Sequence, residues 1–241
     1  MNQDSYLSNK PIDVNERLIF ALDFESNDQA KKIVETLGDA VNFYKLGLEL
    51  FMAGSYYEMV DWLVQQDKKV FVDLKFFDVP QTVGSAVRQL KNKGATFTTV
   101  HGNDSILSSA VAEKGDLKIL AVTVLTSLDR SDLKDLGFQV DVEQLVLSRA
   151  KRSLNLGCDG VISSGLEARG LRDSLGENFL IVTPGIRPVD NTDDQKRTVD
   201  IEEAFLNGAD YIVVGRPIKL ADDPCRTACA FQERIRRVFE G

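Results

Sequence analysis

Eight short apolar runs, rich in Val, Ile, Leu and Phe, recur along the chain and alternate with longer segments of helical spacing. The runs span 17–23, 43–50, 69–75, 97–102, 117–125, 159–165, 179–185 and 210–216. Amphipathic segments such as 27–38 and 83–94 lie between them, and several end at glycine, the residue that commonly follows a helix. Strands that alternate with helices predict βαβ units and a parallel sheet.

The number of these units indicates the fold class within the α/β proteins. Eight units in a chain of 241 residues favour a closed (β/α)8 (TIM) barrel, and a doubly wound open sheet is the alternative. No Pro-rich or low-complexity linker divides the chain, so we expect one barrel domain over residues 15–241. Residues 1–14 are polar and lack an apolar stretch, which predicts an N-terminal tail.

Polar residues interrupt the apolar runs mainly at the C-terminal side of each predicted strand. They include Asp23, Lys45, Asp73, Lys75, His101, Thr126 and Arg216. In a (β/α)8 barrel, the C-terminal ends of the strands form the rim on which active sites are built. The sequence therefore predicts a polar site at this rim.

The stretch "KVFVDLKFFDVPQT" (69–82) carries the densest charge within an apolar run. Because side chains alternate along a strand, Phe71, Asp73 and Lys75 share one face, and three aliphatic residues share the other. The aliphatic face should contact the helices, so we expect Asp73 and Lys75 to point into the barrel mouth. An unpaired buried charge is costly, so we expect the two to pair. A lysine held charged beside carboxylates can donate a proton, which suits chemistry that creates a carbanion.

The C-terminal third of the chain predicts a phosphate site. The loops after the seventh and eighth strands of such barrels often bind phosphate. Here Gly185 and Gly215 let backbone N–H groups approach an anion, and Arg187 and Arg216 supply planar donors. We expect the long polar loop between the two strands to be a lid, with Gln195 able to touch the ligand.

Composition narrows the class of protein. The formal net charge is −8 and no run of Lys and Arg appears, which disfavours nucleic-acid binding. No stretch approaches the length of a membrane span. Cys225 and Cys229 are four residues apart, but one further Cys and one His are too few to favour a zinc site. We therefore expect reduced thiols in a cytoplasmic protein.

Each candidate residue has a plainer explanation when it is taken alone. Asp73 with Lys75 fits a solvated ion pair, and Lys45 fits a lysine that buries only its stem. His101 is the only histidine, and a hydrogen-bonded residue lining the barrel is favoured over a catalytic one. Acids of the "DNTDDQ" segment are more often solvated than metal-bound. No nucleotide-cofactor or zinc motif is present.

Several motifs together resemble the orotidine 5'-phosphate decarboxylase family. The segment "VFVDLKFFDVPQT" (70–82) carries a D-x-K-x-x-D-[IV]-P-x-T pattern that is similar to that of the family. The likeness continues in the family's order through "FALD" (20–23), "YKLG" (44–47), "AVTVLTS" (121–127), "TPGIRP" (183–188) and "VVGRP" (213–217). The D-x-K-x-x-D part alone also resembles sugar-phosphate enzymes, whereas the Pro80 and Thr82 extension is more specific.

The resemblance implies decarboxylation of orotidine 5'-monophosphate to uridine 5'-monophosphate, the last step of de novo pyrimidine synthesis, without a cofactor or metal. It implies that Lys75 protonates the C6 carbanion and that Asp73 lies near the departing carboxylate. It further implies that Lys45 links Asp73 to the ribose and that Asp23 binds a ribose hydroxyl.

The resemblance also implies a homodimer with shared sites. Asp78 and Thr82 would come from the other subunit, Asp78 completing the charge network and Thr82 meeting the ribose or phosphate. Thr126 would contact the pyrimidine edge. The phosphate would be held by Arg187, Gln195, Gly215 and Arg216.

Two other functions fit the same rim. A metal-dependent decarboxylase or aldolase acting on a sugar phosphate would need magnesium. A barrel that only binds a nucleotide and reports it to a partner would bind ligand without turnover. A purely structural barrel does not explain so many inward charges.

Overall fold

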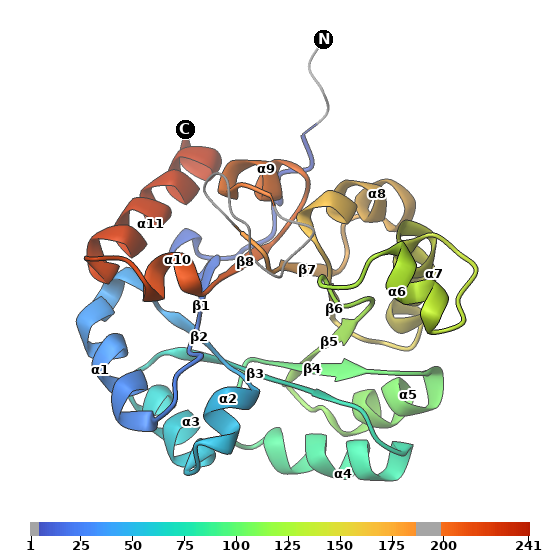
Figure 1. The fold of residues 1–241 in the computed structure, drawn as a ribbon, viewed down its shortest axis with the longest axis horizontal. Helices are drawn as coiled ribbons and strands as arrows, with labels where there is room; N and C mark the ends of the chain where they lie inside the picture. Colours follow the sequence, from blue (N-terminus) through green and yellow to red (C-terminus); the bar gives the residue numbers. More distant parts are fainter. Residues whose placement is uncertain (1–4, 187–198) are drawn as a thin grey trace.

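A computed structural model describes residues 5–186 and 199–241. In this part of the chain, parallel strands close into a barrel in sequence order (Figure 1). The strands are β1 (Leu18–Ala21), β2 (Phe43–Leu46), β3 (Lys69–Phe76), β4 (Phe97–His101), β5 (Lys118–Val122), β6 (Gly160–Ile162), β7 (Leu180–Thr183) and β8 (Tyr211–Val214). Because β1 pairs with both β2 and β8, the predicted (β/α)8 barrel is confirmed and the open sheet is excluded.

Helices surround the barrel as an outer ring (Figure 1). They are α1 (Asn27–Leu37), α2 (Leu48–Met52), α3 (Tyr56–Gln65), α4 (Pro80–Leu90), α5 (Asp104–Glu113), α6 (Arg130–Asp135), α7 (Val142–Asn155), α8 (Gly165–Leu175), α9 (Ile201–Leu206), α10 (Arg216–Lys219) and α11 (Pro224–Glu240). None of the helices in the described ranges is long and apolar enough to cross a membrane.

Two sequence predictions shift in the structure. The apolar run 43–50 is not one strand, because β2 ends at Leu46 and α2 begins at Leu48. The helix expected over 83–94 begins earlier, at Pro80, whose fixed φ suits the first turn of a helix, and it ends at Leu90.

The strands separate two apolar cores. Ile19, Phe43 and Phe71 belong to the cluster inside the barrel. Val70 and Val72 belong to the larger cluster between the strands and the helices. The alternation predicted for β3 is therefore confirmed, with Phe71 inside and its aliphatic neighbours outside.

A buried ion network closes the barrel at the N-terminal end of β8. The Asp210 carboxylate is fully buried and accepts hydrogen bonds from Arg172 at 2.8 Å and from the backbone N–H of Ile181 at 2.9 Å. Ser8 and Lys10, in the predicted tail, also donate to this carboxylate, at 2.6 and 2.9 Å. Desolvation lowers the pKa of Lys10 although Asp210 opposes the shift. The network ties the start of the chain to β7, β8 and α8.

We predict that Asp210→Ala lowers the free energy of unfolding by about 3–5 kcal/mol, because it leaves the buried Arg172 without its carboxylate partner. Urea denaturation followed by circular dichroism measures this loss. Asp104→Ala, which breaks the exposed pair with Arg152, is the control and should cost much less. If Asp210→Ala does not fold, Asp210→Asn gives a milder comparison. A loss in the free energy of unfolding no larger than that of the control would contradict a stabilising role for the Asp210 carboxylate.

Candidate active site

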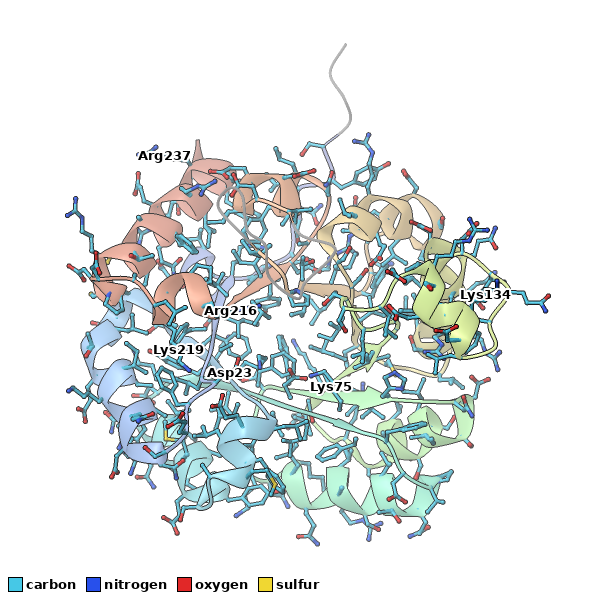
Figure 2. The ribbon with its side chains drawn as sticks, in the orientation of Figure 1. Asp23, Lys75, Lys134, Arg216, Lys219 and Arg237 are labelled. Atoms are coloured by element: carbon cyan, nitrogen blue, oxygen red, sulfur yellow. The ribbon has the colours of Figure 1, made fainter. Side chains whose placement is uncertain are left out.

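A cavity of about 330 Å³ opens at the C-terminal ends of the strands. Seven of the predicted site residues line it: Asp23, Lys45, Asp73, Lys75, Thr126, Gly215 and Arg216. Figure 2 shows Asp23, Lys75 and Arg216 around the centre of the barrel, whereas Lys134 projects from its outer edge. The strand order therefore brings residues from distant parts of the sequence to one rim.

Four charged residues form an alternating row, the charge chain: Asp23, which follows β1, Lys45 on β2, and Asp73 and Lys75 on β3. The Lys45 ammonium lies 3.4 Å from Asp23 Oδ1 and 3.4 Å from Asp73 Oδ2. The Lys75 ammonium lies 2.9 Å from both oxygens of Asp73. Two carboxylates and two ammonium groups thus alternate along the wall, as expected for charges that share a poorly solvated site.

Burial and ion pairing have opposite effects on the pKa values of Lys45 and Asp73. Burial alone would lower the pKa of Lys45, but the carboxylates of Asp73 and Asp23 outweigh it and leave that pKa raised. Burial alone would raise the pKa of Asp73, but the ammonium groups of Lys45 and Lys75 outweigh it and leave that pKa lowered. At neutral pH, Asp73 is therefore a carboxylate and Lys45 an ammonium.

The backbone of β3 is irregular where it carries the site. Val72 pairs with Thr98 and Phe76 pairs with Val100, so the three residues from Asp73 to Lys75 lie opposite Thr99 alone. Within this bulge Lys75 has φ +49°, a left-handed conformation that costs a non-glycine residue roughly 1–2 kcal/mol. The Lys75 backbone N–H donates to Thr99 Oγ1 at 2.9 Å.

A second wall of the cavity comes from residues that follow β7 and β8, and it adjoins Asp23 because β8 pairs with β1. Gly185 and Gly215 line the cavity beside Arg216, the first residue of α10. A Cβ on Gly215 would lie 3.4 Å from that of Ala21 and 3.9 Å from Asp23 Oδ2, which is ordinary van der Waals contact and places Gly215 beside Asp23. Gly185 has φ +80°, which favours glycine.

Two of the predicted site residues that the structure describes, Asp78 and Thr82, do not line this cavity. Asp78 and Thr82 are exposed, and the Asp78 carboxylate accepts a hydrogen bond from the backbone N–H of Val79 at 2.6 Å. Arg187 and Gln195 lie outside the described residues, as do the acids of the "DNTDDQ" segment.

Thr99 has no role in the sequence predictions, yet it is part of the charge chain. Its side chain is fully buried, and its hydroxyl donates to Asp73 Oδ1 at 2.8 Å while it accepts the Lys75 N–H. Its position near the end of the fourth apolar run was the available signal. A threonine inside a strand, however, is usually explained by β-propensity.

His101 lies at the end of β4, where its ring packs edge-on against Phe77 at a centroid distance of 5.3 Å. Its Nδ1 atom is buried and finds no hydrogen-bond partner among the described residues, so the predicted hydrogen-bonded role does not hold at this nitrogen. Desolvation, with the positive charges of Arg149 and Lys75, lowers the pKa of the imidazole.

The fold and the site define the class of protein: a (β/α)8-barrel enzyme with a charged cavity at the C-terminal ends of its strands. A family model described as "Orotidine 5'-phosphate decarboxylase / HUMPS family" matches residues 16–231. The chain belongs to this family, as its motifs predicted, and it is a carboxy-lyase.

Individual relatives cover almost the whole chain. An orotidine 5'-phosphate decarboxylase of Methylococcus capsulatus is 62% identical over 237 residues, which are 98% of each chain. One of Xanthomonas axonopodis pv. citri is 50% identical over 229 residues, 94% of each chain. The crystal structure of orotidine 5'-phosphate decarboxylase from Lactobacillus acidophilus has a TM-score of 0.81 and 38% identity, and the match covers 94% of this chain and 100% of that chain.

We predict that the single imidazole, observed by proton NMR, titrates below its ordinary pKa and that Lys75→Met moves the midpoint upward, because a nearby positive charge is removed. The control Lys134→Met, at the outer edge of the barrel, should leave the midpoint unchanged (Figure 2). Because the folded pKa lies below the unfolded one, the His101 contribution to stability should fall as pH drops through the unfolded value. An unshifted midpoint in Lys75→Met would place the ammonium away from His101.

Proposed function

We propose that this enzyme decarboxylates orotidine 5'-monophosphate to uridine 5'-monophosphate without a cofactor or metal, and that Lys75 supplies the proton. The reaction would be the last step of de novo pyrimidine synthesis. The observation that carries the proposal is the Lys75 ammonium, held by both oxygens of the buried Asp73 carboxylate at the cavity wall. The relatives named above support the choice of substrate.

The proposed reaction proceeds in two bond changes. The bond between C6 and the carboxyl carbon breaks, carbon dioxide leaves, and the electron pair stays on C6. The N–H bond of the Lys75 ammonium then breaks as its proton passes to C6, and the neutral amine regains a proton from solvent. No carbonyl group adjoins C6 to take up the electron pair, so charges fixed before the reaction must supply the stabilisation.

The charge chain suits this task because its members are already held in place. Asp73 lies near the departing carboxylate in this proposal, and Lys45 connects it to the ribose. The Lys45 ammonium is largely buried between Asp73 and Asp23, so little reorganisation is needed when substrate binds. Asp23 is about half exposed and can accept a hydrogen bond from a ribose hydroxyl.

The second wall would hold the phosphate. Gly215 and Arg216 line the cavity, and we assign Arg187 and Gln195 to the same role from their motifs. Thr126, on the loop after β5, would contact the pyrimidine edge. A phosphate bound far from C6 supplies binding energy that can orient the reacting carbon toward Lys75.

We further propose a homodimer in which Asp78 and Thr82 complete the partner's site. Both residues are exposed and neither lines the cavity of its own chain. Phe77 and Val79, on either side of Asp78, are 66% and 62% exposed, and burial of such side chains favours association.

We predict that the purified protein, with EDTA present, lowers the ultraviolet absorbance of orotidine 5'-monophosphate as the conjugated carboxylate is lost. Lys75→Ala should reduce turnover at least ~100-fold, as expected when a general acid is removed. Its affinity for uridine 5'-monophosphate should fall much less, since Gly215 and Arg216, and not Lys75, hold the phosphate in this proposal.

The Lys134→Ala variant is the matched control, because it removes an exposed lysine at the outer edge of the barrel (Figure 2). Activity that returns only with added magnesium would favour the metal-dependent alternative. Nucleotide binding without turnover would favour a binding protein. Retained turnover in Lys75→Ala would remove Lys75 from its role.

We predict that two inactive variants, Asp78→Ala and Lys75→Ala, recover activity when they are mixed under conditions that allow subunits to exchange. A heterodimer would hold one site with both native residues, so recovery should approach a quarter of the wild-type activity for equal amounts that mix randomly. Exchange is checked by native mass spectrometry. Exchange without recovery would contradict the shared site.

A further inference from the structure

The Thr99 hydroxyl contacts two different parts of β3 at once. It donates to the carboxylate of Asp73 at 2.8 Å and accepts the backbone N–H of Lys75 at 2.9 Å. A hydroxyl has one proton to donate and lone pairs to accept with, so one small group satisfies both partners. Thr99 itself is fully buried, and solvent therefore cannot replace it easily.

The bulge in β3 explains why a side chain is needed here. Three residues of β3, Asp73 to Lys75, lie opposite Thr99 alone, so the regular ladder is interrupted. Lys75 is also in the left-handed conformation, and its N–H is directed to the Thr99 side chain instead of a backbone carbonyl. An unsatisfied N–H at this depth would be costly, and the hydroxyl removes that cost.

The same hydroxyl therefore fixes both ends of the Asp73–Lys75 pair. It holds the Asp73 carboxylate from one side, and both oxygens of that carboxylate hold the Lys75 ammonium. It also holds the backbone from which the lysine side chain begins. The Thr99 hydroxyl on β4 therefore fixes the backbone N–H of Lys75 directly and its ammonium group through Asp73.

We propose that Thr99 is a positioning residue for the reaction: its hydroxyl keeps Lys75 in the left-handed conformation and holds Asp73, so that the ammonium stays aimed at the reacting carbon. The inference rests on the proposed role of Lys75 as proton donor. Thr99 touches neither substrate nor reacting atoms in this assignment and acts through Asp73 and Lys75.

The neighbouring Thr98 provides a matched control. It lies on the same strand, is equally buried, and its hydroxyl donates to the backbone carbonyl of Val72 at 2.9 Å. Among the described residues its hydroxyl makes no hydrogen bond to Asp73 or Lys75. Replacing either threonine by valine removes one buried hydroxyl at nearly constant shape, but only Thr99→Val removes the hydrogen bonds to the Asp73 carboxylate and to the Lys75 N–H.

The experiment compares kcat for Thr99→Val, Thr99→Ser and Thr98→Val, with folding checked by circular dichroism. Because small displacements of catalytic groups are costly, Thr99→Val should lower kcat on the order of 10- to 100-fold. Thr98→Val should change it less than about threefold, since its hydroxyl bonds only a backbone carbonyl. Thr99→Ser keeps the hydroxyl and should recover most of the loss.

Two further measurements separate positioning from simple loss of stability. The dissociation constant for uridine 5'-monophosphate should change less than about fivefold in Thr99→Val, because the phosphate wall is intact. The hydroxyl also helps to keep the pKa of Asp73 low, so its loss should move the acid limb of the kcat profile to higher pH. Thr98→Val should leave that limb in place.

Each outcome has a defined meaning. Wild-type turnover in Thr99→Val, or equal losses in Thr99→Val and Thr98→Val, would overturn the inference. An unmoved acid limb would also overturn it. If Thr99→Val does not fold, Thr99→Ala is compared with Thr98→Ala under the same criteria. A wild-type protein that does not decarboxylate would reject the proposed function together with this inference, whereas an active wild type with an unaffected Thr99→Val would reject the inference alone.

Discussion

The Asp73 carboxylate, buried and held between two ammonium groups, is the interaction on which the site depends. A buried carboxylate is tolerated only if positive partners and hydrogen bonds replace the water it loses. Lys45 and Lys75 provide the charge, and Thr99 provides the hydrogen bond. Because β1, β2 and β3 are neighbours in the barrel, the charge chain continues from Asp73 through Lys45 to Asp23 without a gap. Keeping the Asp73 carboxylate ionised therefore requires the side chains of Lys45, Lys75 and Thr99 to stay in place.

The barrel separates the parts of the molecule that hold it together from the part that reacts. The network around the fully buried Asp210 carboxylate lies at the N-terminal end of β8, and the charge chain lies at the opposite ends of the strands. In (β/α)8 barrels the N-terminal face generally serves stability and the C-terminal face serves chemistry. Strain at Lys75 can therefore be tolerated, because packing elsewhere in the barrel holds the fold.

The sequence predicted those features that follow from periodicity. Alternation with period two placed Phe71 inside the barrel and Val72 outside, and it placed Asp73 and Lys75 in the mouth. The bulge was not predictable, because the two extra residues in β3 depend on its partner strand and leave no mark in local spacing. Thr99 was missed for the same reason. The network at Asp210 was missed because its members are about 200 residues apart in the chain, from Ser8 to Asp210.

The pairing of β1 with β8 has a consequence for biosynthesis. Asp23 follows the first strand and Arg216 follows the last, and the two strands meet only when the barrel closes. A ribosome makes the chain from its N-terminus, so a nascent polypeptide that lacks β8 has the Asp23 carboxylate but not Arg216, and its cavity is incomplete. A ligand that needs both residues cannot stabilise such a fragment, and it can stabilise the fold only after translation has passed the final strand.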